Sequence, residues 1–514
     1  MRLIVSIADD QAEAVIASAQ SALLTGADLV ELRLDQAAPD QVDALLTAAT
    51  ELPRGRWIAT LRSEEEGGRC TRSANDRRAI LLRAAVSGAG YIDVERRDAA
   101  APFWHDGELG DAGLIVSQHC LEGIPVNPAG ILRQLRELRG NVHGAAKLAW
   151  ACRDIAENLT ALDLMRGVPG ERIVIAMGEK GVISRVLARK CGAFGTFCAP
   201  DDGPATAAGQ VTVGAMLEDL GWVGQTANTQ LFGVIGSPNA HSMSPAIFNA
   251  QFRKAAANAV YLPLRVDSER ELRGFLEGCR SRPWLNARGF SVTVPHKHAA
   301  LGVAGQLADP LTRRIGAANT LDFMEDGIAA YNTDYAGALG AIAAGMGVAE
   351  DALTGMRVTV LGAGGVARAV VAGLTEKGAK VTIYNRSAPR ASALSSDFNC
   401  QTGDWDDRQR HNGELLINCT SLGMQPAVEE TPMSPEGLRR DLAVFDTVYN
   451  PRETRLLRLA RAAGCRTIDG VAMFVQQAAA QYLLWMSRVP DTELFERIVS
   501  DRLGSARRTG GQGE

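Results

Sequence analysis

Short β-rich runs alternate with helix-forming segments through about the first 220 residues, and this alternation constrains the fold more than any other feature. The segments between the runs are rich in Ala and Leu at helical spacing. Because strands that alternate with helices pair in parallel, eight such units predict an α/β fold with a closed (β/α)₈ TIM barrel. An open doubly wound sheet is the alternative that this pattern leaves open. The runs are LIVSIA (3–8), LVELRLD (29–35), RWIATLR (56–62), YIDVE (91–95), LIVSQHC (114–120), AAKLAWA (145–151), RIVIAMG (172–178) and GTFCAP (195–200).

Ionisable side chains gather toward the carboxyl ends of these runs. A barrel brings the carboxyl ends of its strands to one mouth, where active sites form. One such residue alone would be read as a solvated strand end, whereas six converging groups favour an active site. They are Glu31, Arg33, Arg62, Glu95, His119 and Lys147.

Lys147 lies in an otherwise apolar run. Burial of a lysine favours its neutral amine, which attacks ketones to form a Schiff base. The alternative is a lysine that reaches from a strand end to water. His119 on the preceding run favours the chemical reading, because imidazole is a suitable proton shuttle for imine chemistry.

The motifs ELRLD, TLR, IDVE, SQH, the lone lysine, MGxxGxxSR (177–185) and a late GQ resemble type I 3-dehydroquinate dehydratase over residues 1–222. The resemblance implies that Lys147 forms an imine with the substrate ketone and that His119 moves the protons. It implies that Glu95 supports His119. The residues expected to hold the substrate carboxylate and hydroxyls are Glu31, Arg33, Arg62, Arg185, Thr206 and Gln210. Thr206 begins a Thr-Ala-Ala-Gly-Gln segment where the family often has Ser-Ala-Pro-Gly-Gln.

A dinucleotide-binding signature lies in the second half, in MRVTVLGAGGVARAVVAGL (356–374). A β-rich run ends in a GxGxxA turn and a helical pattern follows, which is the setting that places pyrophosphate at a helix N-terminus. The turn consists of Gly362, Ala363, Gly364, Gly365, Val366 and Ala367.

The next β-rich run, AKVTIYNRS (379–387), ends in Asn385, Arg386 and Ser387 and has no acidic residue there. An acid at this point would bind the ribose hydroxyl of NAD, whereas an arginine can pair with a 2′-phosphate. The sequence therefore predicts NADP as the cofactor; the alternative is that Arg386 is only a surface residue.

Further motifs surround this unit, namely GSPNAHSMSP (236–245), SVTVPHK (291–297), GAANT (316–320), NTDxxG (332–337), NCTSLGM (418–424), DTVYNPxxT (446–454) and GVAMFVQQ (470–477). Together they resemble shikimate dehydrogenase over residues 228–505. The resemblance implies a two-lobed enzyme with a substrate-binding domain at 228–335, completed by C-terminal helices at 469–505, and a Rossmann-like NADP domain at 340–468. Residues 222–230 are expected to be a short linker, and residues 506–514 a disordered tail.

The same resemblance implies roles for single residues. Lys297 and Asp334 match the catalytic pair, and Ser242 and Ser244 match the pair that binds the substrate carboxylate. Further substrate contacts are expected from Thr293, Asn319, Tyr449 and Gln477. Further cofactor contacts are expected from Asn418, Thr420, Gly423, Met424, Gly470 and Met473.

The two halves imply consecutive reactions, because 3-dehydroshikimate is the product of the first and the substrate of the second. Two alternatives remain: the second half reduces 3-dehydroquinate to quinate, or the barrel is a non-catalytic scaffold. No basic run or zinc-type spacing predicts nucleic acid or metal binding, and no apolar run approaches the roughly 18 residues of a membrane span. Nine scattered cysteines without a Cys-x-x-Cys pair, and an N-terminus without a signal-peptide pattern, favour the cytoplasm.

Overall fold

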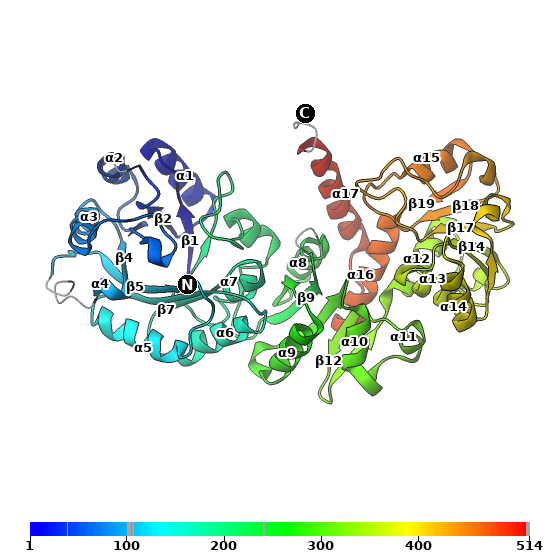
Figure 1. Ribbon diagram of the computed structural model, residues 1–514, viewed down its shortest axis with the longest axis horizontal. Coiled ribbons are helices and arrows are strands. Elements are labelled where there is room, and N and C mark those ends of the chain that lie inside the picture. The colour runs from blue at the N-terminus through cyan, green and yellow to red at the C-terminus, as the bar shows by residue number, and fades with distance from the viewer. Residues whose placement is uncertain (39, 100–103, 105–106, 240–241, 510–514) are drawn as a thin grey trace. The chain divides into compact units, whose positions relative to one another are not determined.

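A computed structural model describes residues 1–514 except 39, 100–103, 105–106, 240–241 and 510–514 (Figure 1). The chain forms two compact units. The first comprises Met1–His241 and Ala256–Ala287, and the second comprises Ser242–Ala255 and Arg288–Glu514. The domain boundaries inferred from the sequence stay predictions.

Eight parallel strands form the sheet of the first unit, in the order β7-β6-β5-β4-β3-β2-β1-β8. The last and first strands of that order approach each other, since the amide of Phe194 donates to the carbonyl of Arg172 at 2.8 Å. The sheet is therefore a nearly closed barrel, which confirms the prediction. Its strands are β1 (Arg2–Ile7), β2 (Leu29–Arg33), β3 (Trp57–Thr60), β4 (Tyr91–Glu95), β5 (Gly113–Cys120), β6 (Gly144–Ala151), β7 (Arg172–Met177) and β8 (Gly195–Cys198).

Helices connect these strands and cover the outside of the barrel (Figure 1). Inward-facing side chains such as Ile4, Ile58 and Ile115 pack into one buried cluster, so the barrel interior is a core and not a pore. The helices are α1 (Ala12–Thr25), α2 (Val42–Ala48), α3 (Ala74–Val86), α4 (Arg96–Ala99), α5 (Pro128–Arg139), α6 (Glu157–Gly167) and α7 (Val182–Val186), with short 3₁₀ turns η1 (Ala49–Glu51), η2 (Glu64–Glu66) and η4 (Glu179–Gly181) and a π-helical turn η5 (Ala215–Asp219).

The expected linker at 222–230 is held against the barrel. The buried ammonium of Lys190 donates to the carbonyls of Ala227 and Thr229, at 2.7 and 2.8 Å. The chain then enters β9 (Gln230–Gly236), which pairs in parallel with β10 (Ala259–Arg265), and continues into α9 (Glu269–Arg280) and η6 (Pro283–Leu285).

The second unit contains a six-stranded parallel sheet in the order β16-β15-β14-β17-β18-β19. The order reverses at β14, which is the arrangement of a Rossmann-like sheet and confirms that prediction. The strands are β14 (Arg357–Leu361), β15 (Lys380–Tyr384), β16 (Gln401–Gly403), β17 (Leu415–Asn418), β18 (Ala443–Asp446) and β19 (Arg466–Ile468); the associated helices are η8 (Glu350–Leu353), α13 (Gly365–Glu376), α14 (Ala388–Phe398), η9 (Trp405–Arg410), η10 (Pro435–Gly437) and α15 (Arg455–Ala462).

The other part of the second unit is built on antiparallel strands β11 (Ala287–Val292), β12 (Thr320–Phe323) and β13 (Ile328–Tyr331). The long helices α12 and α16 pack against each other beside them (Figure 1). The helices are α8 (Ser244–Lys254), α10 (Lys297–Ala304), η7 (Gly305–Leu307), α11 (Pro310–Ile315), α12 (Thr333–Met346), α16 (Gly470–Met486) and α17 (Thr492–Thr509).

The last helix is longer than the sequence led us to expect. α17 continues through residues 506–509, which were predicted to belong to a disordered tail. Ala506, Arg507 and Arg508 are residues that favour helix, whereas the chain beyond Thr509 begins with two glycines. Residues 510–514 lie outside the described part of the chain.

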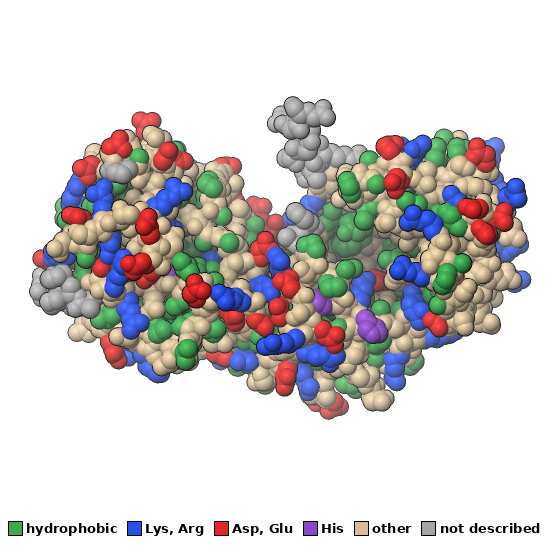
Figure 2. All heavy atoms as spheres, viewed as in Figure 1, with side chains coloured by type: hydrophobic (Ala, Val, Ile, Leu, Met, Phe, Trp, Pro, Cys, Tyr) green, Lys and Arg blue, Asp and Glu red, His purple; other side chains and the backbone are tan. Residues whose placement is uncertain are grey.

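Acidic and basic side chains are interspersed over the face shown in Figure 2. Among the residues that the structure describes, no helix is both long and apolar enough to cross a membrane.

Candidate active sites

A cavity of about 400 Å³ opens at the carboxyl ends of the barrel strands. Eight of the nine residues predicted for the dehydratase site line it, although they come from six strands or the loops that follow them. They are Glu31, Arg33, Arg62, His119, Lys147, Arg185, Thr206 and Gln210. The barrel therefore gathers these side chains as the strand pattern predicted.

Lys147 lines this cavity, and its side chain is only 5% exposed. Its Nζ is 3.1 Å from Asp93 Oδ2 and 3.5 Å from Glu31 Oε1, and it lies 4.1 Å from the centroid of the Phe197 ring. The surroundings are thus not the purely apolar pocket that the AAKLAW run suggested. Two carboxylates therefore orient the Nζ of Lys147, which attacks a carbonyl only as the neutral amine.

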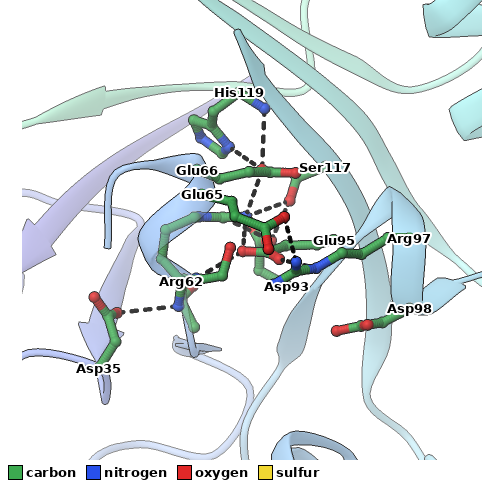
Figure 3. A network of polar contacts seen from close by, with 12 residues as sticks. Asp35, Arg62, Glu65, Glu66, Asp93, Glu95, Arg97, Asp98, Ser117 and His119 are labelled. Atoms are coloured by element: carbon green, nitrogen blue, oxygen red, sulfur yellow. Dashed lines mark hydrogen bonds and ion pairs between the residues drawn. The ribbon is translucent and has the colours of Figure 1, made fainter. Parts of the chain in front are cut away.

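Asp93, which was not predicted from the sequence, contacts both Lys147 and Arg62. Its Oδ1 accepts hydrogen bonds from Arg62 at 2.8 Å and from Ser117 at 2.5 Å (Figure 3). Burial opposes ionisation, but the cations of Arg62 and Lys147 outweigh it and hold the pKa of Asp93 well below its ordinary value. Asp93 lies two residues before Glu95 on β4, so its position on the same face of the strand was the signal that could have revealed it.

His119 is held by Glu66, a second residue that was not predicted from the sequence. Glu66 Oε2 is 2.9 Å from His119 Nδ1 and also accepts the His119 backbone amide at 3.0 Å (Figure 3). Burial, with Arg62 and Lys147 nearby, lowers the pKa of His119 well below its ordinary value. Burial also raises the pKa of Glu66 to about 7. The neutral imidazole is therefore the form present near neutral pH, ready to accept a proton through Nε2.

Glu95 does not reach His119, which corrects the role predicted for it. Its Oε1 accepts the amide of Ser63 at 2.8 Å, and its Oε2 lies 3.1 Å from Arg97 Nε. The carboxylate is thus used to fasten the loop after β3, while η2, which begins two residues after Arg62, carries Glu66 over to the imidazole (Figure 3).

The three arginines of the cavity differ in how they are paired. Arg33 makes two bonds of 2.8 Å to Asp35, and Arg62 is paired with Asp93. Arg185 donates to the carbonyl of Phe197 at 3.1 Å, and its buried Nε has no hydrogen-bond partner in the part of the chain that the structure describes. Burial without a neighbouring carboxylate lowers the pKa of Arg185 to about 10. An anionic group of a ligand would satisfy this guanidinium.

A loop at the rim supplies the remaining polar groups. Gln210 Oε1 accepts from the amide and hydroxyl of Thr206, at 2.9 and 3.1 Å, so these two predicted residues lie in contact. Gly209 packs so closely on Gly178 that a Cβ at this position would lie 2.2 Å from its backbone.

The second unit contains the other predicted catalytic pair. Lys297 Nζ is 2.6 Å from Asp334 Oδ2, at the start of α10 and α12. Asn319 donates to Asp334 Oδ1 at 2.8 Å and to Gln477 Oε1 at 3.3 Å. Four of the predicted residues therefore form one hydrogen-bonded group.

The other residues predicted for this substrate site contact different partners. The backbone amide of Ser244 donates to the Ser242 hydroxyl at 3.3 Å. Tyr449, 39% exposed, places its ring 5.5 Å from that of Phe474, and Thr293 is partly buried just before α10.

A cavity of about 230 Å³ lies at the carboxyl ends of β14, β15 and β17. Gly362 has φ 110°, and a Cβ there would lie 3.0 Å from the carbonyl of Cys419, so the tight turn requires glycine. Helix α13 begins at Gly365 without a side-chain cap, which leaves its first amides for a phosphate. The cavity is lined by Gly362, Ala363, Gly364, Asn385, Arg386, Arg390, Trp405, Cys419, Thr420, Ser421 and Leu422.

No carboxylate lines this cavity among the residues the structure describes, whereas two guanidinium groups do. Arg386 was predicted; Arg390 was missed, although it lies one helical turn further on. This donor set fits a dinucleotide that carries a 2′-phosphate.

The structure brings only part of the predicted cofactor set to the cavity. Asn418 is fully buried and donates to Asp446 at 2.9 Å, so it braces the turn after β17 and does not line the cavity. The other predicted residues that do not line the cavity are Gly365, Val366, Ala367, Ser387, Gly423, Met424, Gly470 and Met473.

Comparison with known proteins finds relatives of both halves of the chain. Family models match for type I 3-dehydroquinase (residues 3–227), the shikimate dehydrogenase substrate binding domain (234–321) and shikimate/quinate 5-dehydrogenase (347–453). A shikimate dehydrogenase (NADP(+)) of Methanosarcina barkeri is 39% identical over 284 residues, which are 53% of this chain and 99% of the relative. A crystal structure of a shikimate dehydrogenase in complex with NADP+ covers 54% of this chain and 97% of its own, with a TM-score of 0.50 and 31% identity.

One relative extends over both halves. The chloroplastic bifunctional 3-dehydroquinate dehydratase/shikimate dehydrogenase of Arabidopsis thaliana is 35% identical over 510 residues, which are 96% of this chain and 83% of the relative. The chain therefore belongs to the family of bifunctional 3-dehydroquinate dehydratase/shikimate dehydrogenases.

Proposed function

We propose that the two sites carry out consecutive steps of the shikimate pathway: dehydration of 3-dehydroquinate to 3-dehydroshikimate in the barrel, then NADPH-dependent reduction to shikimate in the second unit. The observation that carries the proposal is Lys147, buried between two carboxylates in the same cavity as a neutral His119 and the unpaired Nε of Arg185. These are the groups that an imine-forming enzyme with an anionic substrate requires.

The three arginines of the barrel cavity differ in whether a protein carboxylate already pairs with them, and this difference selects the one that binds the substrate. Arg185 has no carboxylate partner among the described residues, so it binds the substrate carboxylate with the smallest loss of existing contacts. Thr206 and Gln210, which already contact each other, close over the substrate and present polar groups to its hydroxyls.

The dehydration then proceeds through the lysine. Once Lys147 has lost its proton to water, its Nζ attacks the ketone carbon, and the ketone oxygen leaves as water to give the imine. His119 removes a proton from the neighbouring carbon, and the electron pair moves toward the imine nitrogen. The resulting enamine expels the hydroxyl group, to which His119 returns the proton, and water then hydrolyses the product imine.

In the second site, NADPH supplies the hydride when it is bound. The chain supplies the proton: Lys297, hydrogen-bonded to Asp334, donates to the oxygen of the ketone as it becomes an alcohol. Asn319 fixes the other oxygen of Asp334, so the carboxylate keeps its orientation during the transfer. Ser242 and Ser244 bind the substrate carboxylate, and Arg386 with Arg390 binds the 2′-phosphate of the cofactor.

We also propose that the enzyme acts on small molecules in the cytoplasm and binds no nucleic acid. The mixed surface charge and nine cysteines, all free in the described part of the chain, support this. Cell fractionation tests the location: recovery of the chain in an organelle or membrane fraction would contradict it.

Borohydride trapping tests the imine directly. Reduction in the presence of 3-dehydroquinate should attach the ligand irreversibly to Lys147, as shown by a mass increase on the peptide that contains it. A protein that gains no mass, or gains it on another lysine, contradicts the mechanism.

A further inference from the structure

The turn η4 of the barrel contacts residues that follow β9 in the chain. Lys180 Nζ lies 2.7 Å from Glu271 Oε1 and 2.9 Å from Asp267 Oδ2, and it also donates to the carbonyl of Arg153 at 3.0 Å. Glu179 forms an ion pair with Arg265. All of these residues belong to the first compact unit, but Arg265, Asp267 and Glu271 lie at the end of β10 and the start of α9, beyond the region that the dehydratase family model matches.

This turn is part of the rim of the dehydratase cavity. Gly178, which lines the cavity, donates its amide to the carbonyl of Ala208 at 3.0 Å, within the loop that carries Thr206 and Gln210. On its other side the turn leads directly into α7, which contains Arg185. Both groups expected to hold the substrate thus depend on the position of residues 178–181.

The ion pairs of Lys180 are partly buried and are braced by a further hydrogen bond to its backbone. Its side chain is 13% exposed and that of Glu271 15%, and the backbone carbonyl of Lys180 accepts a bond of 2.8 Å from the buried Asn158. The hydroxyl of Ser237 and the ammonium of Lys180 keep the pKa of Asp267 well below its ordinary value, so this carboxylate stays charged over the working pH range. Partial burial makes such a network stronger than an exposed pair.

We propose that Lys180 is a positioning residue for the dehydratase, and that Asp267 and Glu271, from the dehydrogenase part of the chain, hold the substrate-binding rim through it. The inference rests on the dehydratase function proposed above. It means that the second enzyme of the fusion completes the site of the first, in addition to being tethered to it.

Kinetics of the full chain test this inference. Lys180→Met should raise KM for 3-dehydroquinate about 5- to 10-fold and leave kcat within about 2-fold, because binding is lost and the chemistry at Lys147 is untouched. Lys180→Arg keeps the positive charge and should restore most of the affinity. Glu271→Lys, which places a second cation beside Lys180, should raise KM at least as much as Lys180→Met.

Asp163→Lys is the matched control. Asp163 on α6 pairs with Arg282, which follows α9, at 2.7 Å, so the control makes the same charge reversal in the same contact region without touching the turn. Its KM should stay within about 2-fold of the original chain.

Two results overturn the proposal: an unchanged KM in Lys180→Met, or an equal rise of KM in Asp163→Lys. If Glu271→Lys proves unfolded by circular dichroism, the comparison of Lys180→Met with Lys180→Arg decides alone. If the original chain has no dehydratase activity, the proposed function is contradicted and this inference is not. Amide hydrogen exchange of residues 178–186 then tests whether Asp267 and Glu271 hold the rim through Lys180: exchange should be faster in Lys180→Met, and an unchanged rate would overturn the inference.

Discussion

The two units of the molecule each present a lysine beside a carboxylate, yet they hold it in opposite ways. Lys147 is almost fully enclosed and has two carboxylate neighbours, whereas Lys297 has one described carboxylate partner and a side chain that is 28% exposed. The difference follows from what each lysine must do. A nucleophile that forms a covalent bond must be aimed and shielded from water, while a proton donor must recover its proton from solvent after each turnover.

The greatest expected effect comes from removing the enclosed lysine. Lys147→Met should abolish dehydration, by roughly 10⁴-fold or more, because no other described group in the cavity can form an imine. Reduction of added 3-dehydroshikimate should stay within about 2-fold, since the second site lies in the other unit. The two rates are measured separately, the first by absorbance of the conjugated product and the second by oxidation of NADPH. Residual dehydration above about 1% would show that the lysine is not the nucleophile.

Removal of the partly exposed lysine should cost less. Lys297→Met should slow reduction by about 10²- to 10⁴-fold, the usual range for loss of a proton donor, with dehydration unchanged. Asp334→Asn keeps the shape of the pair and serves as the matched variant; it should lower kcat more than it raises KM. Equal losses in both activities would point to unfolding and would contradict the separation of the two sites.

A third variant sharpens the cofactor prediction. Arg386→Ala combined with Arg390→Ala should raise KM for NADPH about 10- to 100-fold while leaving KM for NADH within about 3-fold, because only NADPH carries the 2′-phosphate. Steady-state kinetics with both cofactors measure this preference. An equal rise for both would mean that the two guanidinium groups act on another part of the dinucleotide.

The smallest effect concerns the pH dependence of the barrel. Glu66, with a pKa of about 7, is hydrogen-bonded to His119, whose pKa is lowered. The fall of kcat/KM at acid pH, or acid limb, in the original chain therefore reports the coupled titration of both groups. In Glu66→Gln only His119 titrates, and burial together with Arg62 and Lys147 still opposes its protonation. We expect the limb to move to lower pH and below 6.5, with a rate reduced about 3- to 10-fold through poorer orientation of the ring. A limb at or above pH 6.5 in this variant would contradict the neutral imidazole.

The shifted pKa values of Glu66 and His119 also make the stability of the fold depend on pH. The folded-state pKa of His119 is depressed, so its contribution to stability is present above about pH 6.5 and is lost as the pH falls. Glu66 has the opposite sign: its contribution is present below its unfolded pKa near 4.5 and is lost as the pH rises toward 7. Thermal melts of His119→Asn and Glu66→Gln against pH should therefore diverge in opposite directions from the original chain.

Much of the barrel site could be predicted from the sequence because strand periodicity puts side chains at the carboxyl ends of parallel strands into one mouth. That argument placed Glu31 and Lys147 correctly, although they are more than 100 residues apart. It failed for Glu66, which lies on the turn η2, because the direction of a side chain on a turn follows from tertiary packing and has no period. The role predicted for Glu95 was wrong although this residue lies on a strand. Its carboxylate accepts the amide of Ser63 in the loop after β3, a tertiary contact that strand periodicity does not predict.

The cofactor site shows a different limit. The GxGxxA turn and Arg386 could be predicted because the Rossmann-like unit fixes their spacing from the strand ends. Asn418 was assigned to the ligand from its motif, but its side chain turns inward to Asp446, which a strand-end position alone does not reveal. The rim contacts of Lys180 were also out of reach, since they join residues about 90 positions apart across two catalytic regions.

The most direct test of two consecutive active sites is to identify by mass the product that the purified chain makes from 3-dehydroquinate and NADPH, with Lys147→Met and Lys297→Met in parallel. The proposed function predicts shikimate from the original chain, no shikimate from Lys147→Met, and accumulation of 3-dehydroshikimate from Lys297→Met. Quinate as the product, or shikimate formed equally well by Lys147→Met, would contradict it.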